Sequence, residues 1–322
     1  MAVLSILQPI APDMGRLDAR IRERLASDVP LVAQVAEYIV AGGGKRLRPA
    51  LVLLSSAACG VRGDAPLELA AVVEFIHTAT LLHDDVVDES PMRRGRRTAN
   101  TAFGNAAAVL VGDFLYSRAF QMMVGVDSMR VMQVLAEATN TIAAGEVLQL
   151  MNCRDPEVEE EAYLDVVRRK TAKLFEASAR LGPVLAGAPA AEEAALADYG
   201  MHLGTAFQLI DDVLDYSGDA EAIGKSLGDD LAEGKPTLPL IRAMRAGSAD
   251  QRALVRHAIV DGSRDDLAAV IAVIRDTGAL EYARDAAERE ARAAQSALAR
   301  LADSSARQSL LELASFSVTR DH

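Results

Sequence analysis

Apolar residues recur at helical spacing along almost the whole of this 322-residue chain. Residues 31–40 are a clear example, because their apolar positions fall three and four apart and the run stops at Gly42–Gly44. Aromatic residues make up only 4% of the chain, whereas strands draw on aromatic and β-branched side chains. No segment alternates as a strand does, and no Ser/Gly-rich linker divides the chain. We therefore expect one all-α domain over residues 1–322, a bundle of roughly ten or more helices.

Glycine and proline residues mark the expected helix ends. One helix should run from about residue 49 to Gly60, and the next from Asp64, as its cap, toward Asp88. Asp155, which precedes a proline, is another expected cap. The polar, Arg-rich segment 89–100 is expected to be a loop. Further helices are predicted over residues 106–124, 128–151, 158–181, 190–216, 239–246 and, as a charged outer helix, 282–301.

Charge and cysteine content exclude several classes of protein. The net charge of −12 disfavours binding to nucleic acid, because an acidic surface repels phosphate backbones. Cys59 and Cys153 lack zinc-ligand spacing and cannot form a disulfide framework, so we expect two reduced thiols. The N-terminal segment has no basic region typical of a signal peptide, and no run of 18 apolar residues occurs. We expect a cytoplasmic protein with no nucleic-acid partner and no stable membrane insertion.

One acidic pattern occurs twice, as Asp84-Asp85-Val86-Val87-Asp88 and Asp211-Asp212-Val213-Leu214-Asp215. The first and last aspartates of each copy lie on one face of a helix, where like charges repel unless a hard cation lies between them. Mg²⁺ suits carboxylates combined with substrate phosphates. A solvated acidic surface would explain a single copy, but both copies follow strongly apolar turns, at residues 78–82 and 207–210. The pattern predicts metal sites with all six aspartates as candidate ligands.

Basic residues gather near these motifs. Arg side chains bind phosphate oxygens as a fork and Lys side chains bind them as point charges, so cations beside metal sites indicate a diphosphate pocket. The candidates are Lys45, Arg46 and Arg48 after a glycine run; Arg93, Arg94, Arg96 and Arg97 after the first motif; Lys170; and Lys225 and Lys235 after the second motif. Arg46, Arg96 and Arg97 are equally well explained as solvated surface bases.

The order of these motifs resembles the trans-isoprenyl diphosphate synthase family, the head-to-tail prenyltransferases. The resemblance runs from about Leu31 to the C-terminus and comprises Gly43–Pro49, His77, the first Asp motif, Arg93-Arg94, Lys170-Thr171, Gln208, the second Asp motif and Lys225. The flanking segments 74–83 and 204–210 are most similar to those of members that make octaprenyl (C40) chains.

The resemblance implies a fold, a reaction and a role for each residue. The isoprenoid synthase fold encloses a central cavity in which the two Asp motifs face each other and hold Mg²⁺, usually three ions. Those ions bind the allylic diphosphate, farnesyl diphosphate above all, and isopentenyl diphosphate adds to the cation left when diphosphate departs. No side chain is evident as the base, so the released diphosphate is expected to take the proton. The metal ligands would be Asp84, Asp88 and Asp211 with Asp85, Asp212 and Asp215 in support; the allylic diphosphate ligands Arg93, Lys170 and Lys225; the isopentenyl diphosphate ligands Lys45, Arg48, His77 and Arg94; and the groups facing the cation Thr171 and Gln208.

Product length depends on an apolar channel for the growing chain. Family members with short products often carry an aromatic residue where this chain has Ala79 and Thr80, so the channel should be open here. Met123 is a candidate for its floor, although Met at helical spacing is more often plain core. The C40 assignment therefore rests on resemblance, and three alternatives stay open: a geranylgeranyl-type or a solanesyl- or decaprenyl-type length, a cyclising relative, or a non-catalytic subunit of a heteromeric synthase.

The resemblance also implies a homodimer, transient membrane contact during product release, and a quinone side chain as the destination of the product. In the C-terminal segment 319–322, Arg320 is the one residue that is always positively charged. We therefore do not predict that a basic tail closes over the substrate.

Overall fold

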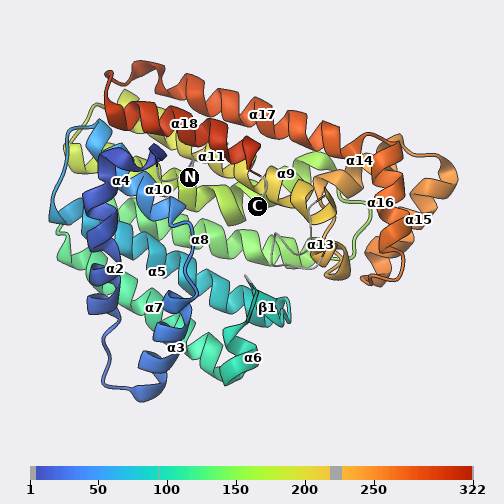
Figure 1. Ribbon diagram of the computed structural model, residues 1–322, viewed down its shortest axis with the longest axis horizontal. Helices are drawn as coiled ribbons and strands as arrows, with labels where there is room; N and C mark the ends of the chain where they lie inside the picture. Colours follow the sequence, from blue (N-terminus) through green and yellow to red (C-terminus); the bar gives the residue numbers. More distant parts are fainter. Residues whose placement is uncertain (1–4, 94, 218–226, 321–322) are drawn as a thin grey trace. The chain divides into compact units, whose positions relative to one another are not determined.

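The computed structural model describes residues 5–93, 95–217 and 227–320 (Figure 1). These residues are almost entirely helical, which confirms the predicted all-α class. The only strands among them are β1 (Met92–Arg93) and β2 (Arg96–Arg97), which pair antiparallel with Met92 opposite Arg97. The strands form a small hairpin inside the segment that was predicted to be a loop.

The chain divides into two compact units, each assembled from separate stretches of sequence. Unit 1 comprises Met1–Thr139, Leu174–Gly200 and Ala297–Leu313, and unit 2 comprises Asn140–Lys173, Met201–Ser296 and Ala314–His322. Three helices are divided between the units, α8 (Met129–Asn152), α11 (Ala190–Ser217) and α18 (Ser305–Thr319), and two more, α10 (Lys173–Ala186) and α17 (Ala279–Ala297), each have one terminal residue, Lys173 and Ala297, in the other unit. The single domain over residues 1–322 stays a prediction.

Helix α5 (Asp64–Val87) is the centre of unit 1 and packs against α2, α4 and α7 (Figure 1). Residues 69–73 of α5 are fully buried, as expected for a helix that is apolar on every side. Helix α5 is long and apolar enough to cross a membrane by length and composition alone. However, 78% of its most apolar stretch is buried inside the protein, and a buried core helix passes the same test. The other elements of unit 1 are η1 (Gln8–Ile10), α2 (Ala11–Leu25), α3 (Pro30–Ala41), α4 (Leu47–Ala58), α6 (Ala99–Phe103), α7 (Asn105–Gly125), α10 (Lys173–Ala186) and η3 (Leu298–Arg300).

Unit 2 has two neighbouring hydrophobic clusters. In one, α14 (Leu238–Ala246), α15 (Ala249–Asp261) and α16 (Leu267–Asp276) pack together (Figure 1) around Leu240, Val255 and Ile274. In the other, the apolar residues 209, 210, 213 and 214 of α11 pack against Tyr163 and Ala283. This packing holds the helix that carries the second acidic motif. The remaining elements of unit 2 are α9 (Glu160–Val167), the π-helical turn η2 (Arg168–Ala172), α13 (Asp229–Ala232) and α17 (Ala279–Ala297).

Several predicted helix ends are wrong for local reasons. Asp64 is not the cap of α5 but its first residue, after Gly63, and its carboxylate accepts a hydrogen bond from Arg16 at 2.6 Å. Asp155 does not start a helix, because its side chain instead accepts the backbone N–H of Glu157 at 2.9 Å and α9 begins five residues later. The predicted helix over residues 158–181 is interrupted by η2. Helix α2 was not predicted at all.

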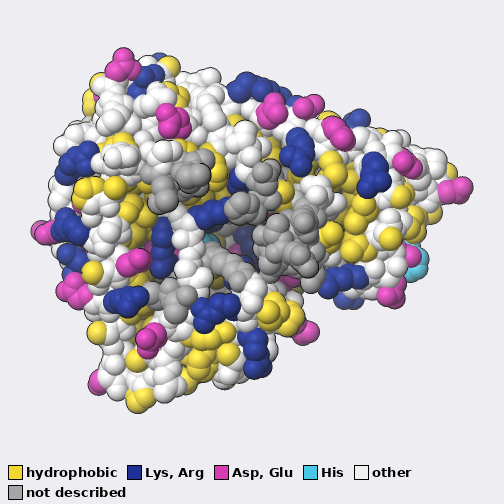
Figure 2. Space-filling view, in the orientation of Figure 1, with side chains coloured by type: hydrophobic (Ala, Val, Ile, Leu, Met, Phe, Trp, Pro, Cys, Tyr) yellow, Lys and Arg dark blue, Asp and Glu magenta, His cyan; other side chains and the backbone are white. Residues whose placement is uncertain are grey.

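Charged side chains cover much of the exposed surface. On the face shown in Figure 2, Lys and Arg side chains are interspersed with Asp and Glu side chains. Exposed apolar side chains are found on α7, at Leu110 and Val124, and on α8, at Met129, Val147, Leu150 and Met151.

Candidate active site

The first acidic motif occupies the last turn of α5, in unit 1. Asp84 and Asp88 are half-buried, and the N–H of Asp88 donates to the Asp84 carbonyl at 2.8 Å. Asp85 is only 5% exposed and accepts a hydrogen bond from Arg93 Nε at 2.8 Å, donated from strand β1. Burial raises the pKa of the Asp85 carboxyl, and the Arg93 charge opposes that increase. The motif therefore divides into an outward pair of carboxylates and one inward carboxylate held by an arginine.

A glycine lets α5 approach α7 closely beside this motif. A Cβ at Gly112 would lie 2.4 Å from His83 Nε2, so the His83 ring fills the space that a side chain would need. His83 Nε2 lies 3.3 Å from the Val109 carbonyl and 3.3 Å from Asp113 Oδ1. His83 was missed by the sequence analysis, although a glycine within an apolar helix is a signal of close packing.

Arg48 and His77 lie together in unit 1, as their proposed shared role requires. Arg48 Nη1 is 3.2 Å from His77 Nε2, and the Arg48 guanidinium lies 4.4 Å from the centroid of the Phe175 ring. His77 is seven residues before Asp84 on the same face of α5, about 10 Å along the helix axis. Lys45 belongs to the loop just before α4. Arg94 lies outside the described residues, so its predicted role has no structural counterpart here.

The second acidic motif ends the long helix α11, in unit 2. Asp212 is 1% exposed and accepts hydrogen bonds from the Tyr163 hydroxyl and, at 2.7 Å, from Gln208 Nε2. Burial, followed by the nearby Asp230 charge, raises the pKa of Asp212 well above its ordinary range. Asp215 accepts the backbone N–H groups of Asp229 and Asp230, both at 3.2 Å, at the start of α13. Asp211, the remaining member, is half-buried.

Arg320, near the C-terminus, is bound to Asp211. Its Nη2 donates to Asp211 Oδ1 at 2.5 Å and to the Phe207 carbonyl at 2.8 Å. Its guanidinium also lies 3.8 Å from the centroid of the Phe207 ring, and the side chain is 4% exposed. This pairing of Arg320 with Asp211 was not predicted from the sequence. The available signal was that Arg320 is the one firm cation at the end of the chain.

Lys170 and Thr171 lie in the π-helical turn η2, and π turns often occur at functional sites. Lys170 Nζ contacts Gln149 Oε1 at 2.6 Å and Glu146 Oε2 at 2.5 Å. The Thr171 hydroxyl donates to Gln208 Oε1 at 3.2 Å. Because Gln208 Nε2 donates to Asp212, the Gln208 carbonyl oxygen is turned toward Thr171. Lys225 lies outside the described residues.

The donor chemistry of the acidic motifs fits Mg²⁺, which prefers carboxylate oxygens. In the described part of the chain, no three His, Cys, Asp or Glu side chains are arranged to hold one ion. Asp85, Asp211, Asp212 and Asp215 each accept hydrogen bonds from protein donors, so each would have to share or exchange those bonds in order to bind a metal ion. Such a site would need diphosphate oxygens and water to complete its coordination.

The three residues proposed to control product length lie in unit 1. Ala79 and Met123 are fully buried, and the Thr80 hydroxyl donates to the His77 carbonyl at 2.8 Å. Thr80 therefore connects the candidate channel wall with the turn that carries His77.

Comparisons with known proteins agree with the motifs. The polyprenyl synthetase family model matches residues 29–274. Octaprenyl diphosphate synthase of Escherichia coli K12 is 55% identical over 97% of both chains. All-trans-nonaprenyl-diphosphate synthase (geranyl-diphosphate specific) of Rhodobacter capsulatus is 46% identical, over 98% of this chain and 97% of the relative. The crystal structure of polyprenyl synthase from Caulobacter crescentus CB15, complexed with calcium and isoprenyl diphosphate, has a TM-score of 0.96 at 43% identity, covering 99% of this chain and 98% of that one.

The family model covers more than half of the chain, and similarity to the first two relatives extends over almost its full length. This chain belongs to the polyprenyl synthetase family of prenyltransferases.

Proposed function

We propose that the chain is a Mg²⁺-dependent synthase that condenses isopentenyl diphosphate with an allylic diphosphate, such as farnesyl diphosphate, into all-trans octaprenyl diphosphate. The proposed reaction type is supported above all by the positions of His77, Asp84 and Asp88 along α5. The Arg48–His77 pair lies two helical turns before the carboxylates of Asp84 and Asp88 on one face. A pair of nitrogen donors and a pair of carboxylates about 10 Å apart along the helix suit two diphosphates, one bound directly and one bound through metal ions.

In this proposal Asp84, Asp88 and Asp211 hold the Mg²⁺ ions, three by family resemblance. When bound, the ions stabilise the negative charge that develops on the departing diphosphate. The carbon–oxygen bond of the allylic diphosphate breaks, its C1 bonds to the terminal alkene carbon of isopentenyl diphosphate, and the released diphosphate accepts the proton. Lys170 and Arg93, with Lys225, bind the allylic diphosphate, which requires Lys170 to exchange its contact with Glu146 for phosphate oxygens.

The second substrate is assigned to Lys45, Arg48, His77 and Arg94. Thr171 and Gln208 are assigned to the allylic cation by family resemblance, and the buried Asp212 fixes the orientation of the Gln208 amide. We therefore assign Asp212 the role of orienting the Gln208 amide, in addition to any contact with a metal ion. The calcium and isoprenyl diphosphate in the related Caulobacter structure support the use of a divalent cation and of a diphosphate ligand.

The C40 length is supported by 55% identity to an octaprenyl synthase, against 46% for the nonaprenyl synthase. Ala79 and Thr80 leave the turn before the acidic motif without an aromatic side chain. Met123 remains the proposed floor of the channel. We also propose a cytoplasmic location, transient membrane contact during release of the apolar product, and a quinone side chain as its destination.

We further propose a homodimer. Leu110 and Val124 on α7 and Met129 on α8 are 65%, 66% and 73% exposed, and Val147, Leu150 and Met151 continue the exposed apolar residues along α8. Exposed apolar stretches of this kind mark protein interfaces.

The reaction is tested with radiolabelled isopentenyl diphosphate, farnesyl diphosphate and Mg²⁺, and with Asp84→Asn and Asp64→Asn as matched variants. Both aspartates belong to α5, but Asp64 is at the far end of the helix with a 74% exposed side chain. We expect Asp84→Asn to reduce incorporation by about 100-fold or more, in line with the loss of a group that stabilises a departing anion. Asp64→Asn should stay within about twofold of wild type. Full activity of Asp84→Asn would contradict the proposal.

A further inference from the structure

The loop before α4 contains two residues with left-handed backbone conformations. Gly43 has a φ of 62° and follows the end of α3, and Arg46 has a φ of 49° and is the N-cap of α4. Glycine adopts this conformation freely, whereas a residue with a Cβ does so at a cost in free energy. The Arg46 side chain makes no capping hydrogen bond that would compensate. Other contacts of Arg46 must therefore keep the loop in this conformation.

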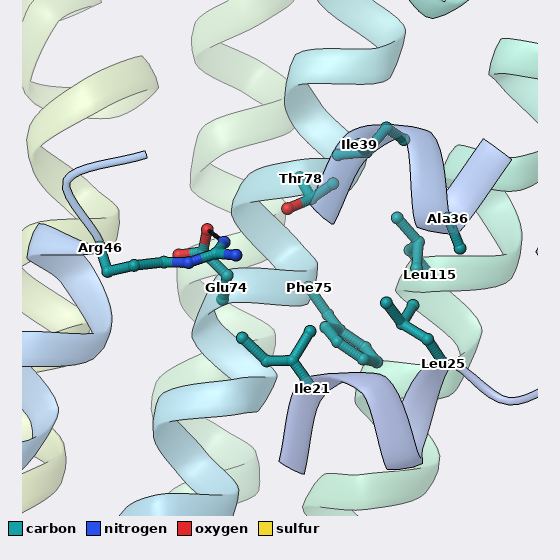
Figure 3. A pocket seen from close by; sticks show the side chains of 9 residues that line it. All are labelled: Ile21, Leu25, Ala36, Ile39, Arg46, Glu74, Phe75, Thr78 and Leu115. Atoms are coloured by element: carbon teal, nitrogen blue, oxygen red, sulfur yellow. Dashed lines mark hydrogen bonds and ion pairs between the residues drawn. The ribbon is translucent and has the colours of Figure 1, made fainter. Parts of the chain in front are cut away.

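Those contacts come from α5 and α2. Arg46 Nη1 forms an ion pair with Glu74 Oε1, and Arg46 Nη2 lies 3.7 Å from Asp18 Oδ1. The side chains of Arg46 and Glu74 are 14% and 9% exposed. Figure 3 shows Arg46 reaching from its loop to Glu74 at a pocket whose other lining residues, apart from Thr78, are apolar. Arg46 is thus not a solvated surface base, and its guanidinium is bound to Glu74; the alternative left open by the sequence was a direct contact with diphosphate.

One turn of α5 holds this loop at two points. Glu74 and His77 are three residues apart on α5, so they lie on neighbouring positions of the same face. Glu74 pairs with Arg46, and His77 lies 3.2 Å from Arg48, two residues further along the loop–helix junction. Lys45 directly precedes Arg46. The position of Arg46 therefore determines where both proposed diphosphate ligands, Lys45 and Arg48, lie relative to His77.

We propose that Arg46 and Glu74 form a positioning pair for the isopentenyl diphosphate site. Neither residue touches the substrate; the pair holds the left-handed turn so that Lys45 and Arg48 are preorganised beside His77. This inference rests on the proposed function, and it assigns a role to Arg46, the first arginine of the Lys-Arg-Leu-Arg segment. A lysine would replace the two-sided fork by a single point charge, so it could not bind Glu74 and Asp18 in the same way.

The test measures KM for each substrate, kcat, the Kd of isopentenyl diphosphate by calorimetry, and the unfolding temperature. The variants are Arg46→Met, Arg46→Lys, Glu74→Gln and the Arg46→Met/Glu74→Gln double variant. Arg20→Met is the matched control, because Arg20 also pairs with a buried α5 carboxylate, Glu68, at 2.6 Å, but belongs to α2 rather than to the loop. This control removes a comparable ion pair from the same helix.

We expect Arg46→Met and Glu74→Gln each to raise KM and Kd for isopentenyl diphosphate about tenfold, the usual size of a lost positioning contact. KM for the allylic diphosphate and kcat should stay within about twofold. The double variant should be no worse than the poorer single variant, because the pair acts as one unit. Arg46→Lys should recover part of the affinity, and Arg20→Met should lower only the unfolding temperature.

Two results would overturn the inference: equal increases in KM for both substrates, or a change in Kd for Arg20→Met as large as that for Arg46→Met. If Arg46→Met fails to fold, Glu74→Gln and Arg46→Lys provide the same comparison. A wild-type protein that binds isopentenyl diphosphate without elongating it would contradict the proposed function alone, since the calorimetric Kd still tests the positioning pair.

Discussion

Arg93 and Arg320 each donate a charged hydrogen bond to one aspartate of an acidic motif, at 2.8 Å and 2.5 Å. Arg93 belongs to strand β1, eight residues after Asp85, and Arg320 lies 109 residues after Asp211. Loss of Arg93 would leave the buried Asp85 carboxylate without its donor, and loss of Arg320 would leave the half-buried Asp211 carboxylate and the Phe207 carbonyl without theirs. Both arginines are therefore expected to affect stability as well as activity.

Arg320→Met should lower the free energy of unfolding by about 1–3 kcal/mol, because Asp211 and the Phe207 carbonyl both lose a donor. The measurement is urea denaturation followed by circular dichroism. Arg292→Met is the control, since Arg292 is 63% exposed and pairs only along its own helix, an interaction worth a few tenths of a kcal/mol. Equal stability of the two variants would contradict the structural role of Arg320.

Arg93→Met should destabilise the protein more at pH 8 than at pH 5. The pKa of Asp85 is raised, first by burial, so the folded state favours the protonated carboxyl and loses stability as pH rises through the raised pKa. Without Arg93 that pKa rises further, and the added cost at pH 8 should be about 1.5–3 kcal/mol. Urea denaturation at both pH values checks this, and Asp85→Asn in the same background should remove the pH dependence. An equal loss of stability at pH 5 and pH 8 would refute the explanation.

At the scale of elements, helices bounded by glycine could be predicted well. Helix α3 spans Pro30–Ala41, against a prediction of residues 31–40 ending before the glycine run. Helix α2 was missed although Leu17, Ile21 and Leu25 form a buried stripe at helical spacing. The π turn η2 was not predicted, and it packs closely against another helix. A Cβ at Gly145 of α8 would lie 2.7 Å from the Lys170 backbone nitrogen.

Gly145→Ala should therefore displace η2 and the Lys170 side chain with it. We expect a loss of about 1–3 kcal/mol in unfolding free energy, typical of overpacking, together with a higher KM for farnesyl diphosphate. Gly15→Ala in α2 is the control, since nothing lies within 4 Å of a Cβ placed there and alanine favours a helix interior. A Gly145→Ala protein with wild-type stability and KM would show that the close approach is unimportant.

Across the whole molecule, residue identities at the site could be predicted far better than their partners. Lys170, Thr171 and Gln208 were found from motifs, and the structure brings Thr171 and Gln208 into contact. The pairs His83–Asp113, Arg46–Glu74 and Arg320–Asp211 were not predicted. Each joins side chains from separate elements, and helical periodicity reports which face is apolar but not which polar groups meet across that face.

The proposed homodimer is tested by sedimentation of wild type, Leu110→Glu and Val260→Glu. Leu110 is 65% exposed on α7 and Val260 is 48% exposed on α15. Wild type should sediment at twice the 34.2 kDa chain mass, and Leu110→Glu should shift toward the monomer, because a buried charge in the interface is costly. Val260→Glu should remain dimeric. If Leu110→Glu and Val260→Glu both remain dimeric, the interface does not include Leu110.

The central claim is that this chain alone converts farnesyl diphosphate and isopentenyl diphosphate into a C40 product. The most direct measurement is the mass of the products made by the purified wild-type protein with Mg²⁺ and excess isopentenyl diphosphate. The account predicts octaprenyl diphosphate as the main product and no elongation when the metal is chelated. Products that stop at C15 or C20 would contradict the open channel at Ala79 and Thr80, and an absence of any elongation would contradict the synthase function itself.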